Sequence, residues 1–141
     1  MHVSLTRLRI RSLRFLPGFM VYALRSESQV RSAAGFRKGS LLPDRKRTFW
    51  TMTLWDSPGS MRAYMTSGAH KAAMPKLLHW CDQASVTHWE TDEDALPSWE
   101  DAVSRMRSQG RPSKVLHPAP GHADLTFDTP RLSPFKPIAP R

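Results

Sequence analysis

The chain has 141 residues, of which 40% are hydrophobic and 23% charged, and it carries a formal net charge of +9 at pH 7. This length fits one domain with an appendage, and the composition is that of an ordinary globular protein. No apolar run reaches the roughly 18 residues of a membrane span, and the single cysteine, Cys81, excludes an internal disulfide and a zinc site built on several cysteines. We therefore expect a cytoplasmic protein without a membrane span.

The positive charge is concentrated in the first third of the chain. Residues 1–47 contain eleven Lys or Arg against two acidic residues, whereas residues 48–141 contain ten of each. Arg7, Arg9 and Arg11 alternate, so they would share one face of a strand. Such a patch could bind an anion or nucleic acid, but no nucleic-acid-binding motif accompanies it. We favour a solvated basic face and do not expect nucleic acid as a partner.

The first half of the chain contains three predicted strands and one helix. Alternating Val, Leu, Thr and Ile favour strands, whereas apolar residues at steps of three and four, a proline in the first turn and a glycine at the end favour a helix. A strand is predicted at residues 3–10, a helix at 15–34 that ends at Gly35, and two further strands at 36–42 and 47–55.

The strand at 47–55 has two apolar faces. Successive side chains point to opposite faces of the strand: Phe49, Thr51, Thr53 and Trp55 lie on one face, and Trp50, Met52 and Leu54 lie on the other. A small sheet with one wet face would not show this pattern. One face must cover the helices, and we expect the other to meet a second sheet from a partner.

Two helical segments and a strand complete this part of the chain. One helix begins with Pro58 and ends at Gly68, and another runs over residues 69–82, where Pro75 predicts a kink or a break. The last strand is expected at 84–91. The order of strand, helix, strand, strand, helix, strand is the split β-α-β arrangement of ferredoxin-like α+β domains, which we assign to residues 1–95.

Residues 96–141 differ in composition, since they contain eight of the twelve prolines. Ser98 as an N-cap and Gly110 at the end predict a C-terminal helix over about 98–109. Beyond it we expect an extended arm without a core of its own. Three large apolar side chains predict that this arm packs on the domain or on its partner: Phe127, Leu132 and Phe135.

His70 is the candidate for chemistry. At 100° per residue it shares a helix face with Ala73, Met74, Leu77 and Cys81, which must face inward, whereas His79 falls on the opposite face. An inward imidazole can act as a base, ligate haem iron or orient a substrate carbonyl. It can equally be a buried histidine bonded to a backbone carbonyl. The residues themselves leave these alternatives open.

Aromatic residues form the second candidate feature, with five tryptophans and two tyrosines. They can wall an apolar ligand site or serve as plain core. An arginine one turn before the possible kink could reach an anionic ligand group or lie on the surface. The expected ligand pocket consists of Trp50, Trp55, Tyr64, Met74, Trp89 and Arg62. No Gly-rich phosphate loop, nucleophile elbow or HExxH motif is present, and we expect no metal site apart from His70 if haem is bound.

Several segments resemble the dimeric α+β barrel superfamily. Within it, they look like bacterial proteins labelled spheroidene monooxygenase-like, beside the antibiotic-biosynthesis monooxygenases. The similar segments are residues 49–55 (FWTMTLW), 61–64, 67–75 and Trp89, with 6–9 and 15–17 near the start and 97–100 and 112–115 in the tail.

This resemblance implies a homodimer whose two sheets face each other, with a pocket for a small apolar or aromatic molecule between sheet and helices. Relatives in the superfamily include cofactor-free monooxygenases and haem enzymes. The resemblance therefore implies a monooxygenase-like oxidoreductase, with or without haem, in which His70 is the acid/base or the iron ligand. The alternative is a protein of the same fold that binds a small ligand, haem included, without catalysis.

Overall fold

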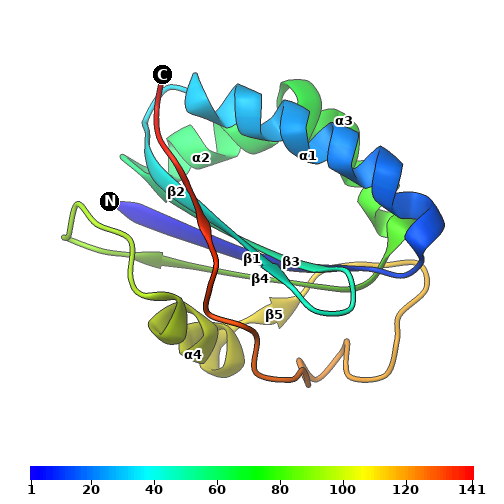
Figure 1. Cartoon of the computed structure of the whole chain (residues 1–141). Coiled ribbons are helices and arrows are strands. Elements are labelled where there is room, and N and C mark those ends of the chain that lie inside the picture. Colours follow the sequence, from blue (N-terminus) through cyan, green and yellow to red (C-terminus); the bar gives the residue numbers. More distant parts are fainter.

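The computed structural model describes residues 1–141 as one sheet with helices on both faces (Figure 1). The strands are β1 (His2–Ile10), β2 (Phe36–Asp44), β3 (Thr48–Trp55), β4 (Cys81–Glu90), β5 (Arg111–Pro112) and β6 (Lys136–Ile138). The helices are the 3-10 turn η1 (Leu13–Phe15), α1 (Leu16–Arg31), α2 (Pro58–Met65), α3 (Gly68–Trp80) and α4 (Trp99–Gln109). None of these helices has the length and apolarity needed to cross a membrane.

The sheet is antiparallel throughout, in the order β5-β4-β1-β3-β2-β6. Its four long strands give the order β4-β1-β3-β2 of the split β-α-β fold, so the predicted α+β class is confirmed. Two local features differ from the sequence-based expectation. The strand predicted at 36–42 continues to Asp44, so the turn between β2 and β3 lies at residues 45–47, where Lys46 and Arg47 have φ of 57° and 60°. Pro75 does not break α3, which continues to Trp80.

Helices α1, α2 and α3 cover one face of the sheet (Figure 1). The apolar residues that they bury form two clusters: Val30, Phe36, Trp55, Met61 and Ile138, and Ile10, Phe19 and Cys81. Burying one such large side chain stabilises the fold by about 1.5–3 kcal/mol. The same burial raises the pKa of the Cys81 thiol to about 12, which keeps it protonated and unreactive.

Helix α4 covers the opposite face of the sheet, on which the sequence had predicted a partner's sheet. Its apolar stripe packs with the second face of β3 into the largest core cluster: Val3, Leu5, Leu42, Trp50, Met52, Leu54, Trp99, Ala102, Val103 and Met106. The stripe follows the helical steps of three and four residues that bury one face of a helix. The two apolar faces of β3 therefore need no second copy to be buried, contrary to the sequence-based reason for expecting one.

The arm after α4 pairs with both edges of the sheet. Strand β5 adds to β4, and β6 adds to β2. Of the three apolar side chains expected to anchor the arm, Phe127 packs against the largest cluster, whereas Leu132 and Phe135 are 40% and 51% exposed. Backbone pairing at the sheet edges thus holds the arm where its own side chains do not.

Gly35 links α1 to β2 in a conformation that few other residues adopt. Its φ is +82°, and a Cβ at this position would come within 2.3 Å of the Ser60 hydroxyl oxygen. We expect Gly35→Ala to lower the free energy of unfolding by about 1–3 kcal/mol in urea titrations. Gly59→Ala is the matched control, because its Cβ would meet only the Ser57 hydroxyl at 3.8 Å. Equal stability of the two variants would contradict this account.

Candidate functional site

His70 lies in the first turn of α3 and is half-buried. Its ring Nδ1 is 3.1 Å from the carbonyl oxygen of Met65. In the tautomer that carries the proton on Nδ1, this is a hydrogen bond from the imidazole to the backbone, and Nε2 keeps a free lone pair. Burial lowers the pKa of His70, with a weaker opposing effect of the Met65 bond, so the ring is neutral at pH 7.

A row of tilted aromatic contacts connects His70 to the sheet. The ring of Tyr64 lies 4.9 Å from the ring of His70 and 5.4 Å from the ring of Trp55, measured between centroids. The Trp55 indole donates to the Thr53 hydroxyl at 2.9 Å, and the Tyr64 hydroxyl donates to the Ser26 carbonyl at 3.2 Å. Burial raises the pKa of Tyr64 to about 12, so its phenol stays protonated. The three aromatic side chains are uncharged at neutral pH.

Gln29, on α1, bonds to the junction of α2 and α3, a contact that the sequence analysis did not predict. Its side-chain amide donates to the carbonyls of Tyr64 at 3.2 Å and Ser67 at 2.9 Å, while its oxygen accepts from the backbone N–H of His70 at 3.0 Å. One amide thus pairs the N–H of His70 in the first turn of α3 and adds a further donor to carbonyls at the end of α2 and just before α3. The pattern of α1 marks Gln29 as polar and says nothing about this distant partner.

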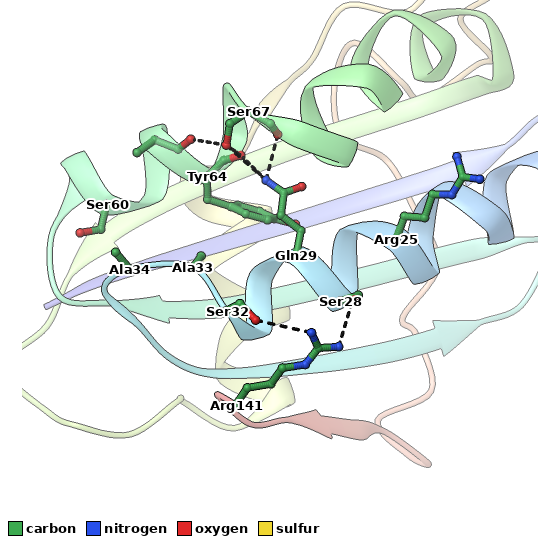
Figure 2. A pocket seen from close by; sticks show the side chains of 11 residues that line it. Arg25, Ser28, Gln29, Ser32, Ala33, Ala34, Ser60, Tyr64, Ser67 and Arg141 are labelled. Atoms are coloured by element: carbon green, nitrogen blue, oxygen red, sulfur yellow. Dashed lines mark hydrogen bonds between the residues drawn. The ribbon is translucent and has the colours of Figure 1, made fainter.

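An open groove of about 620 Å³ lies beside this junction, between α1 and α2. Figure 2 shows Gln29 reaching across to Ser67, and Arg141 reaching the hydroxyls of Ser28 and Ser32. Its walls combine serine hydroxyls and two guanidinium groups with three alanines and Tyr64. The lining residues are Arg25, Ser28, Gln29, Ser32, Ala33, Ala34, Ser60, Ala63, Tyr64, Ser67 and Arg141.

The other residues expected around His70 do not join it. Trp50 is buried against α4, and Trp89 packs on the same cluster, so both lie across the sheet from His70. Arg62 is exposed, and Met74 is 44% exposed. The structure therefore brings together Trp55, Tyr64 and His70 out of the predicted set.

The surroundings of His70 do not fit a haem ligand. His70 is not among the residues that line the groove, and Tyr64 is the one large apolar side chain in walls made otherwise of serines, alanines, Gln29 and two arginines, whereas a porphyrin is enclosed by large apolar side chains. His70 already contacts the Met65 carbonyl through one nitrogen and Tyr64 through its ring.

Residues 13–113 match the model of a protein family described as a domain of unknown function, DUF3291. The chain belongs to this family. The match extends from η1 through α4 to β5, so α4 is part of the DUF3291 domain. No curated protein sequence matches the DUF3291 chain.

Solved structures resemble the DUF3291 chain in fold. One is the protein Rv0793 from Mycobacterium tuberculosis, with a TM-score of 0.59, 10% identity and coverage of 68% of this chain and all of that one. Another is an antibiotic biosynthesis monooxygenase (TM-score 0.58, 13% identity, 69% and 100% covered). A third is SnoaB, a cofactor-independent oxygenase from Streptomyces nogalater, with a TM-score of 0.55, 13% identity and coverage of 68% of this chain and 96% of that one.

These likenesses confirm the resemblance to antibiotic-biosynthesis-monooxygenase-like proteins, and at such identities they show the fold alone. They do not test the spheroidene monooxygenase-like subgroup, which stays a prediction. The neighbours span about two thirds of the DUF3291 chain, at 68% or 69% coverage. About a third of the chain therefore has no counterpart in these neighbours.

Proposed function

We propose that the protein is a small monooxygenase-like oxidoreductase that acts on an apolar or aromatic small molecule, with His70 as a general base. One observation carries the proposal. The His70 imidazole is neutral and is fixed through Nδ1 by the Met65 carbonyl, while Nε2 has no hydrogen-bond partner in the chain. A base needs this combination of a held ring and a free lone pair.

The chemistry follows from the two ring nitrogens. When Nε2 accepts a proton from a substrate, the imidazolium charge is partly compensated by the Met65 carbonyl oxygen, which accepts from Nδ1. Tyr64 and Trp55 supply an aromatic wall beside the ring. The fold shared with a cofactor-independent oxygenase supports a reaction in which the protein supplies the base and the substrate supplies the electrons.

The second candidate is a protein that binds a small ligand without converting it. The groove beside Tyr64 favours this function, because it has room for a small molecule and borders the junction held by Gln29. In this case the contact of His70 with Met65 is structural and serves to fix the start of α3.

His70→Ala separates the two candidates. With an aromatic substrate under oxygen, we expect the variant to lose activity by about 100-fold or more, measured as product formed and oxygen consumed. His79→Ala is the matched control, since His79 is exposed on the same helix. Full activity of His70→Ala would overturn the role of His70. If the wild type binds the ligand without converting it, and His70→Ala binds it with the same affinity, the result would favour the binding protein.

The pH profile gives an independent check. Because burial lowers the pKa of His70, the neutral base persists below the ordinary histidine range. We expect activity to be constant near neutral pH and to fall on acidification with a midpoint below 6.5, the ordinary value. A rise of activity as the pH falls through this region would contradict the role of a base.

Homodimer formation, cytoplasmic location and the division of the chain at residue 95 remain parts of this proposal. Helix α4 covers the face on which two sheets would meet, so a dimer would use another surface or displace α4. Light scattering after size exclusion chromatography measures the molecular mass in solution and so distinguishes a monomer from a dimer. A monomer at micromolar concentration would remove the dimer from the proposal.

A further inference from the structure

The outer surface of α1 carries an exposed apolar stripe. At 100° per residue, Val21 lies opposite Phe19 and Val30, the two buried residues through which α1 packs on the sheet. The stripe consists of four side chains that are 42–69% exposed, half of the eight large apolar side chains that the whole chain exposes: Leu13, Met20, Val21 and Leu24. Single exposed apolar residues are ordinary, but several gathered on one element mark an interaction surface.

The helices around this stripe carry almost only positive charge. Helices α1, α2 and α3 lie together on one face of the sheet (Figure 1). With η1 they form the helical layer, residues 13–31 and 58–80, which holds six Lys or Arg and one acidic residue. That residue, Glu27, pairs with Lys136 at 2.8 Å, and its side chain is only 14% exposed. None of the six basic side chains forms an ion pair, so their charge is available to an anionic partner.

These cations stand in contrast to those of β1, where a solvated basic face was expected from the sequence. Arg7 is 7% exposed and donates to the Gln83 side chain at 2.7 Å, and Arg9 pairs with Asp82 at 2.8 Å. The expectation was therefore wrong for these two arginines. The basic residues that face solvent without an acidic partner lie on the helical layer, beside the apolar stripe.

Aromatic rings lie under the cations where α1 meets α3. The rings of Tyr22 and Trp80 are 6.0 Å apart between centroids, and both residues are half-buried. The Arg25 guanidinium lies 5.9 Å from the centroid of Tyr22, and the Lys76 ammonium lies 5.6 Å from it and 6.0 Å from that of Trp80. Tyrosine and tryptophan are enriched at the boundary between lipid headgroups and acyl chains, and Lys and Arg are attracted to anionic headgroups.

The charge and the shape of this surface decide between possible partners. A second copy of this chain is unsuitable, because pairing two such faces would bring like charges together. An acidic helix of another protein would need a groove to receive its apolar face. The groove between α1 and α2 is lined by none of the four residues of the stripe, which projects outward from α1 instead. An anionic lipid surface accommodates a projecting stripe and supplies the opposite charge.

We propose that the helical layer binds the surface of an anionic lipid membrane, with α1 lying in the plane of the membrane and its apolar stripe inserted among the headgroups. Burial of apolar side chains and attraction to anionic lipids add to each other, as they do in interfacial amphipathic helices. Such binding does not require a helix that crosses the membrane, and this chain has none. The proposal concerns the outer surface of the helices and does not depend on the role of His70.

Cosedimentation of the whole chain with large unilamellar vesicles measures this binding. We expect the protein to bind vesicles of phosphatidylcholine and phosphatidylglycerol at about 7:3, and to bind phosphatidylcholine alone about tenfold more weakly or less, since each Lys or Arg near an anionic surface strengthens binding about fivefold. A chain with a net charge of +9 can also bind anionic lipid through charge alone. Variants that separate this surface from the rest of the protein therefore decide the test.

Two matched pairs of variants make this separation. Leu24→Ser keeps every charge and should weaken binding to the mixed vesicles about five- to tenfold, because a side chain that is 58% exposed no longer enters the lipid. Leu116→Ser is its control, since Leu116 is 55% exposed on the arm. Arg25→Gln should weaken binding about fivefold, whereas Arg105→Gln on α4, whose guanidinium also lies over an aromatic ring, should not. Equal binding within either pair would overturn the proposal.

A fluorescent label reports insertion directly. The native thiol of Cys81 is fully buried, so a nitrobenzoxadiazole reagent should label only the new thiol of Leu24→Cys or of the control Leu116→Cys. On the mixed vesicles, emission of the Leu24 label should rise and shift to shorter wavelength, whereas that of the Leu116 label should not. No vesicle binding, or a Leu24 label that stays in water, would contradict the proposal. Tighter binding of polyglutamate than of vesicles at equal anionic charge would assign the surface to an acidic protein instead and would also overturn it.

Discussion

Trp99→Ala is expected to remove about 3–5 kcal/mol from the free energy of unfolding, as for other large-to-alanine changes in a core. Trp99 is 6% exposed in the cluster between α4 and the sheet. Its ring meets Trp50 edge-on at 6.4 Å, and its indole donates to the Ser40 hydroxyl at 3.1 Å. The change leaves both a cavity and an unpaired hydroxyl, because Ser40 is itself buried.

Denaturant titration followed by tryptophan fluorescence and circular dichroism measures this loss. A typical domain has about 5–15 kcal/mol of stability, so the variant should unfold at a clearly lower denaturant concentration. Leu116→Ala is the control, because Leu116 is 55% exposed and should change stability by less than about 0.5 kcal/mol. Wild-type stability of Trp99→Ala would mean that α4 does not pack on the sheet in solution.

A chain that ends after residue 95 should not remain a folded monomer. Without α4, one face of the sheet exposes a contiguous apolar surface: Val3, Leu5, Leu42, Trp50, Met52 and Leu54. Monomeric proteins rarely expose large apolar patches, and such patches promote association. We expect the shortened chain to self-associate or unfold, as followed by light scattering and near-ultraviolet circular dichroism.

The outcome also tests the predicted division at residue 95 and the predicted pairing of two sheets. A folded, defined dimer of the shortened chain would show that this face can meet a second copy once α4 is removed. A chain that ends after residue 134 is the control, because it keeps α4 and loses only β6 and the residues around it. A stable folded monomer of residues 1–95 would contradict the role of α4 as a core element.

Local signals predicted most of the fold. The alternation in β3 and the N-cap at Ser98 are each decided by neighbouring residues, and the structure contains both features. Gly35 has the positive φ of a terminating glycine, but α1 ends earlier, at Arg31, so the predicted end of this helix was wrong. The Ser98 hydroxyl accepts from the Asp101 N–H at 3.1 Å, as expected for a cap. The place of α4 could not be predicted, because an apolar stripe shows that a helix is buried but not which surface buries it.

The candidate site was predicted less well, for reasons of sheet geometry. Trp50 and Trp55 are five positions apart on one strand, so their side chains point to opposite faces and cannot share a pocket. The alternation of β3 contained this information, yet both residues were assigned to one site. Gln29 and the surroundings of Arg7 depend on pairings between distant segments, which composition and periodicity do not specify.

The arm's last pairing bears on the order in which this protein can fold. Strand β6 places Ile138 opposite Gly39, roughly a hundred residues earlier in the chain. Contacts so distant in sequence form slowly, because the intervening chain must lose much of its freedom before any gain is realised. The hairpin of β2 and β3 is local and can form early. Until β6 docks, the outer edge of β2 stays open to other chains, so a refolding intermediate should be more prone to aggregate than the native protein.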